Sequence, residues 1–119
     1  MAGIYEMARE LGGALARTDE YQALRRAMEA ADEDRELVEL RNRLEVLEDR
    51  IGASVRAGKE PEDDVKRAYG EAAEELQGKA AFQRLIAAQT NFEKIMYKVN
   101  ETVARGIEEG AQSRIIISS

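Results

Sequence analysis

The sequence contains neither cysteine nor histidine. The two side chains that most often act as nucleophile or acid-base catalyst near neutral pH are therefore missing, together with thiolate and imidazole metal ligands. Disulfides are excluded, and a di-iron helical bundle is disfavoured because such sites combine glutamates with a Glu-x-x-His motif. We therefore expect a protein that is not an enzyme and that carries no cofactor or metal.

Bulky apolar side chains are also scarce. Aromatic residues form 5% of the 119 residues, tryptophan is absent, and much of the 44% hydrophobic content is alanine. Charged residues reach 35%, a mixture typical of long, solvent-exposed helices and coiled coils. The length fits one domain. We predict a single all-α domain over residues 1–119, with thin helices that complete their burial against another subunit.

The charge pattern argues against nucleic acid as a direct partner. The net charge is −6 and basic residues are interleaved with acidic ones, whereas phosphate binding requires a concentrated positive surface. The N-terminal segment lacks the basic and apolar regions of a signal peptide, and no window has the length of a membrane span. We expect a cytoplasmic protein with no direct nucleic-acid binding and no membrane insertion.

Short helices are predicted at the N-terminus. Apolar residues recur every three or four positions over residues 3–16, as on one face of a helix. Thr18 is predicted to cap a second helix, because Asp19 and Glu20 follow it and carboxylates stabilise the first turn. The acidic run 32–34 is interpreted as a turn that leads into a third helix.

A long antiparallel hairpin is predicted for the middle of the chain. Its first helix has a heptad-like seam with spacings of three or four: Leu37, Leu40, Leu44, Leu47, Ile51 and Val55. Gly58 is predicted to end this helix, and Pro61 to lie in the first turn of the next. The returning helix should pack its own apolar strip against the seam, with Val65, Tyr69, Ala72 and Leu76.

The candidate interaction site is the apolar stripe of the last predicted helix, which should stop near Gly110. The short N-terminal helices are predicted not to cover this stripe fully, so we expect another subunit or a protein partner on it. The predicted interface consists of Phe82, Leu85, Gln89, Phe92, Met96 and Val99. As the one amide in the seam, Gln89 is predicted to specify register or oligomeric state.

The C-terminal segment, residues 111–119, is predicted to be an extended tail. Ile115, Ile116 and Ile117 are consecutive β-branched residues, which favour strands over helices. An exposed segment of this kind invites edge pairing. The sequence leaves two alternatives for the surface that covers this segment: a groove of the protein's own oligomer, or the sheet edge of a partner.

The pattern as a whole resembles the YlbF/YmcA family over about residues 4–110. The resemblance is carried by the Thr18-Asp19-Glu20-Tyr21 cap, the acidic turn, the leucine seam, the Gly58-Lys59-Glu60-Pro61 loop, and Gln89, Val99-Asn100 and Ile107 in the last helix. It implies a small cytoplasmic bacterial helical protein that forms dimers or larger assemblies. It also implies a regulator of competence, sporulation and biofilm formation, acting through complexes linked to a membrane-associated endoribonuclease and RNA maturation.

Some members of the family are associated with iron-sulfur clusters through cysteines. The present sequence has no cysteine, so no cluster ligand carries over to it. The tail that begins at Arg114 lies outside the resemblance.

Two functions are therefore weighed for an oligomeric helical bundle made of short N-terminal helices plus a long antiparallel hairpin. The first is a non-enzymatic regulator or adaptor that acts by protein-protein interaction, with an endoribonuclease complex as the target that the resemblance implies. The alternative is a structural or holdase-like hairpin protein that binds unfolded clients.

Overall fold

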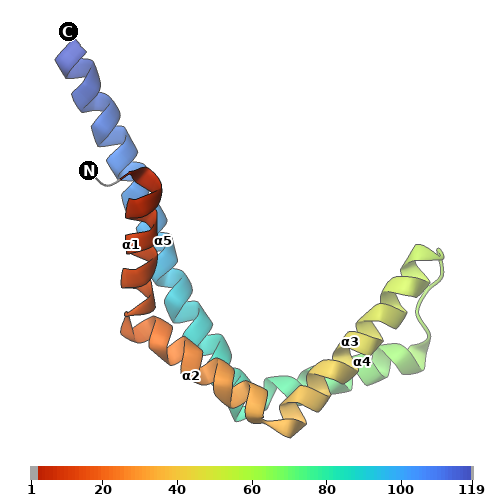
Figure 1. The fold of residues 1–119 in the computed structure, drawn as a ribbon. Coiled ribbons are helices and arrows are strands. Elements are labelled where there is room, and N and C mark those ends of the chain that lie inside the picture. The colour runs from red at the N-terminus through yellow and green to blue at the C-terminus, as the bar shows by residue number, and fades with distance from the viewer. Residues whose placement is uncertain (1–2, 119) are drawn as a thin grey trace.

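The computed structural model describes the backbone of residues 3–118 and the side chains of residues 3–112. It consists of five helices joined by short connections (Figure 1). These are α1 (Ile4–Ala16), α2 (Asp19–Glu33), α3 (Arg35–Arg56), α4 (Asp63–Gln77) and α5 (Ala80–Ser118). All regular structure in residues 3–118 is helical, which confirms the predicted all-α class.

The helix ends follow the local chemistry of the sequence. The hydroxyl of Thr18 accepts the N–H of Tyr21 at 3.1 Å, as expected of an N-cap. At the other end of α3, Gly58 adopts a φ of 71°, the left-handed conformation in which glycine has no steric penalty. The N–H of Lys59 then reaches the carbonyl of Ser54 at 2.9 Å, so α3 closes with a Schellman motif.

Two predicted boundaries are wrong by a few residues. Pro61 lies before α4 and not in its first turn, since α4 begins at Asp63 with Glu62 as its N-cap. The acidic run 32–34 is mostly the last turn of α2, and Asp34 alone forms the connection to α3. A single residue suffices there because the carboxylate of Asp34 accepts the N–H of Leu37 at 3.1 Å and caps α3 directly.

The helices are arranged as two arms that meet at a vertex (Figure 1). The first arm contains α1, α2 and α5, and the second contains α3 and α4. The radius of gyration is 21.9 Å and the molecule extends over 69 × 37 × 21 Å. A compact domain of this length has a radius of gyration of about 13.5 Å. The fold is therefore an open frame with little interior.

The second arm is the predicted antiparallel hairpin. Leu40 and Leu44 of α3 are buried against Ala72 of α4, and half-buried residues from α4 complete the cluster, namely Tyr69, Ala73 and Leu76. The seam does not hold along its full length, because Val55 is 64% exposed. In Figure 1 the two helices diverge towards their connecting loop, in agreement with the exposure of Val55.

The vertex holds the other part of the core. Ala31 of α2, Leu37 of α3 and Leu85 of α5 are buried together, with Leu76 of α4 packed against them. Four helices thus contribute to one small cluster. At the vertex, Asp34 connects α2 to α3, and Gly78 and Lys79 connect α4 to α5.

Helix α5 is longer than predicted, and the extended tail is wrong. The helix continues through Gly110 to Ser118, so residues 111–118 are helical where the isoleucines favoured a strand. Adding residues to an existing helix avoids the cost of nucleation. β-Branched residues oppose this by only a few tenths of a kcal/mol each, and a glycine within a helix by about 1 kcal/mol. Gly110 has no positive φ and so does not form a stop.

Candidate interaction surface

The inner face of α5 packs along α2 in the first arm. Leu85 and Ala88 are buried at this contact. One turn further along α5, the ring of Phe92 lies against Tyr21, with centroids 5.2 Å apart and planes at 59°, a tilted geometry that favours aromatic pairs. The contact follows a spacing of three and four residues, as helix packing requires.

The structure places the six predicted interface residues in three different environments. Leu85 is buried within the chain, so in this structure its side chain faces the chain's own core and not the surface. Phe82 packs against the vertex cluster, and Phe92, Met96 and Val99 are half-buried. Part of the apolar surface of Phe82 and Phe92 is thus covered within the chain, by the vertex cluster and by Tyr21 of α2.

Gln89 does not lie in the seam and is exposed. The stripe runs from Leu85 through Ala88 to Phe92, with Ala88 at the position assigned to Gln89. Spacings of three and of four residues both fit the helical period, so the pattern after Leu85 allows either Ala88 or Gln89 in the stripe. The small side chain of Ala88 made its place in the stripe less evident in the sequence. Gln89 therefore does not interrupt the contact between α5 and α2, and its predicted role in specifying register or oligomeric state stays a prediction. The predicted docking residues Ile115, Ile116 and Ile117 have side chains outside the described residues.

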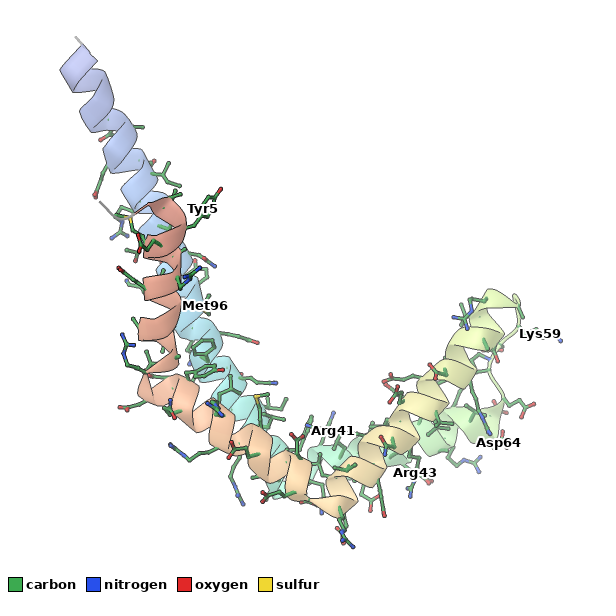
Figure 2. All side chains as sticks on the ribbon, viewed as in Figure 1. Tyr5, Arg41, Arg43, Lys59, Asp64 and Met96 are labelled. Carbon is green, nitrogen blue, oxygen red and sulfur yellow. The ribbon has the colours of Figure 1, made fainter. Side chains whose placement is uncertain are left out.

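The apolar surface that remains exposed lies mainly on α1 and on the C-terminal half of α5. Helix α1 buries none of its residues. Ile4, Met7 and Leu11 are 75%, 58% and 40% exposed and follow one face at spacings of three and four. On α5, Val103 and Ile107 are also exposed. Figure 2 shows Tyr5 projecting from α1 away from the ribbon.

The sequence had already indicated the helical face of α1 without assigning it to an interface. The periodicity of residues 3–16 indicates one helical face, and apolar stripes of this kind normally face a core. The structure leaves this stripe uncovered. Single exposed apolar residues are ordinary on protein surfaces, whereas a row of them along one helix indicates an interaction site.

A shallow groove between α2 and α5 lies on the same arm. Its volume is about 510 Å³, and most of its lining is alanine: Ala23, Ala27 and Ala30 on α2, and Ala81, Ala87 and Ala88 on α5. Arg26, Arg84 and Asn91 complete the lining. Within residues 3–112, neither arginine forms an ion pair. The groove is therefore apolar at its base and positively charged at its rim.

The vertex is held by ion pairs as well as by its apolar cluster. The Lys79 ammonium lies 2.6 Å from Glu36 and 3.8 Å from Asp34, so the start of α5 is tied to the start of α3. The hydrogen bond to Glu36 raises the pKa of Lys79 above its ordinary value of 10.5, and partial burial opposes this shift. The charges of Asp34, Glu36 and Glu75 raise the pKa further. Arg41 and Asp32 form a further pair between α3 and α2, at 3.6 Å.

The described residues show no cluster of three carboxylates placed to hold a metal ion. In the same part of the chain, no helix combines the length and the apolar composition needed to cross a bilayer.

Comparison with known proteins identifies the family. Residues 4–108 match the family described as "Control of competence regulator ComK, YlbF/YmcA". A UPF0342 protein of Limosilactobacillus reuteri is 26% identical over 109 residues, which cover 92% of this chain and 89% of the relative. A UPF0342 protein of Lactobacillus acidophilus is 24% identical over 109 residues, which cover 92% and 94% of the two chains.

A third relative, a UPF0342 protein of Lactobacillus gasseri, is 23% identical over 107 residues, which cover 90% of this chain and 92% of the relative. No solved structure is significantly similar to the chain. The family match spans α1 to α4 and most of α5, and so includes both arms and the exposed stripe of α1. The chain belongs to the YlbF/YmcA family, which is a family of regulatory proteins.

Proposed function

We propose that the protein is a non-enzymatic regulator that self-associates and binds another protein through its first arm. The observation that carries this proposal is the uncovered apolar stripe of α1, with Met7 at its centre 58% exposed. Burying apolar surface contributes about 25 cal/mol per Å². Because α1 buries none of its residues within the chain, a partner that covers its apolar stripe would supply most of this stabilisation.

The family description supports the regulatory part of the proposal, since it names control of the competence regulator ComK. The absence of cysteine and histidine supports action by binding and not by catalysis. As the partner class to test first, we propose an RNA-processing endoribonuclease complex, which the family resemblance implies.

Affinity capture from the cell in which the protein is naturally made tests the proposal. The wild type should retain the same one or two proteins in a fixed, saturable ratio. Met7→Glu places a charge in the stripe and should abolish that capture. Val46→Glu is the matched control, because Val46 on α3 is similarly exposed, at 54%, and lies on the other arm. Equal capture by all three proteins would contradict the assignment of the site to α1.

The open two-armed shape supports the alternative, a holdase that binds unfolded clients. A holdase should suppress aggregation of several unrelated denatured proteins at stoichiometric concentration. A regulator should not do so, and should show saturable binding to its defined partner alone. Suppression of aggregation together with broad, unsaturable capture would favour the holdase and contradict the regulator.

A further inference from the structure

The groove between α2 and α5 and the stripe of α1 have complementary side chains. The groove presents alanines, which leave space between the helices. The stripe presents the large side chains of Ile4, Met7 and Leu11, which are exposed. Large side chains of one helix packing between small ones of another is the usual basis of close helix contact. Among residues 3–112, neither surface meets such a partner.

The spacing of the two rows matches in one direction only. From the N-terminus, the stripe Ile4, Met7 and Leu11 has steps of three and four residues, and the row Ala23, Ala27 and Ala30 has steps of four and three. The steps coincide when the two helices run antiparallel. The first and last residues of each row are seven positions apart, or about 10.5 Å along the helix at about 1.5 Å per residue.

Charge supports the same arrangement. The rim of the groove carries Arg26 and Arg84, which form no ion pair among the residues described. Glu6 and Glu10 lie one turn apart on α1, and Glu10 borders the stripe because it follows Met7 by three residues. In the antiparallel register, both carboxylates fall within one turn of the level of Arg26.

The chain's own α1 does not occupy the groove. It precedes the Thr18 cap and joins α2 at the end that is far from the vertex (Figure 1). The groove lies nearer the vertex, at residues 23–30 and 81–91. A second copy related by a two-fold axis across the arm would reverse the direction of α1, and each copy could then supply its α1 to the other.

We propose that the groove between α2 and α5 binds α1 of a second copy, antiparallel to α2, with Met7 level with Ala27. This inference rests on the self-association included in the proposed function and specifies the contact that produces it. Ile4 then lies level with Ala30, and Leu11 with Ala23. The contact is isologous, so the dimer contains it twice and closes on itself.

Cysteine cross-linking tests this register without interference, because the natural chain has no cysteine. The double variant Met7→Cys with Ala27→Cys should form a covalent dimer under mild oxidation, visible by intact mass and lost on reduction. Each single variant should remain non-covalent. Sedimentation of the unmodified wild type gives the oligomeric state independently of the cross-link.

Three results would overturn the inference: no cross-link in the double variant, a disulfide within one chain, or a cross-link in Met7→Cys alone. Any of these in a protein that sediments as a dimer would overturn the contact and leave the self-association of the proposed function intact. A wild type that sediments as a monomer would contradict both.

A space-filling variant provides a second measurement. Ala27→Leu should fill the groove and weaken self-association by at least tenfold in Kd, with unchanged helicity by circular dichroism. Ala53→Leu makes the same change at an exposed position of α3 and should leave the Kd unchanged. An unchanged Kd for folded Ala27→Leu would overturn the proposed contact.

Discussion

Leu37 has the largest fully buried side chain among the described residues, and it packs where α2, α3 and α5 meet. Leu37→Ala should lower the free energy of unfolding by about 2–5 kcal/mol, because it removes buried methyl groups and leaves a cavity in a small cluster. Chemical denaturation monitored by circular dichroism measures the change. Val46→Ala, at a position that is 54% exposed, should change stability by less than about 0.5 kcal/mol. Equal effects of the two substitutions would contradict the assignment of the core.

The cap at Thr18 has a measurable consequence. Thr18→Ala removes the acceptor for the N–H of Tyr21 and should destabilise the protein by about 0.5–2 kcal/mol. Thermal denaturation checks this value. Thr102→Ala is the control, since the Thr102 hydroxyl donates to the Lys98 carbonyl in the preceding turn of α5 and caps no helix end. A larger loss for Thr102→Ala than for Thr18→Ala would show that the cap is unimportant.

Residue-level prediction succeeded where the determining interactions are local. The Thr18 cap and the left-handed Gly58 depend on neighbours within a few positions, and both were correct. Gln89 and Leu85 depend on which side of α5 meets α2. Packing between segments that are distant in the sequence sets which side of α5 meets α2. The helical period of the sequence therefore did not decide whether Ala88 or Gln89 faces α2.

At the scale of elements, Lys79 links α5 to α3 through Glu36 and Asp34. Because the pKa of Lys79 is raised above 10.5, the ion pairs should hold the vertex below pH 10.5 and weaken as the pH rises through the folded-state value. Small-angle scattering should show wild type and Lys79→Met with different distance distributions at pH 8. The two distributions should converge above the folded-state pKa of Lys79.

Lys66→Met is the matched control for that titration, because Lys66 pairs with Glu60 near the hairpin loop, far from the vertex. Its scattering should follow that of the wild type at every pH. If Lys79→Met and the wild type are indistinguishable at pH 8, the ion pairs do not fix the angle between the arms.

Helix α5 gives a further prediction at this scale. Gly106 is exposed within the helix, and a Cβ built there meets nothing within 4 Å. Gly106→Ala should therefore stabilise the distal helix by about 0.5–1 kcal/mol through the helix propensity of alanine. Amide hydrogen exchange in residues 100–112 should slow accordingly. Faster exchange would indicate that the distal part of α5 is not a continuous helix.

Most elements could be predicted from periodicity and caps, including the hairpin of α3 and α4. The helical conformation of residues 111–118 could not be predicted. The preference of β-branched residues for strands is weak, and an already formed helix overcomes it. The divergence of the hairpin near Val55 was also missed, because a heptad-like seam on α3 does not show whether α4 has enough bulk to meet it. The returning helix offers alanine and glycine there, as at Ala68 and Gly70.

At the scale of the whole molecule, the low aromatic content explains the open frame. With two phenylalanines and no tryptophan, the described part of the chain builds two small clusters in place of one central core. The radius of gyration of 21.9 Å follows from that division. Composition predicted thin helices and incomplete burial, whereas the angle between the arms depends on contacts at the vertex that no sequence pattern specifies.

Sedimentation at micromolar concentration measures whether the exposed stripe of α1 drives self-association. The wild type and Val46→Glu should have masses of at least twice the 13.3 kDa of the chain. Met7→Glu should shift towards the monomer, because burying an unpaired charge costs several kcal/mol. A wild-type mass of 13.3 kDa, or an unchanged mass for folded Met7→Glu, would contradict this role of the stripe.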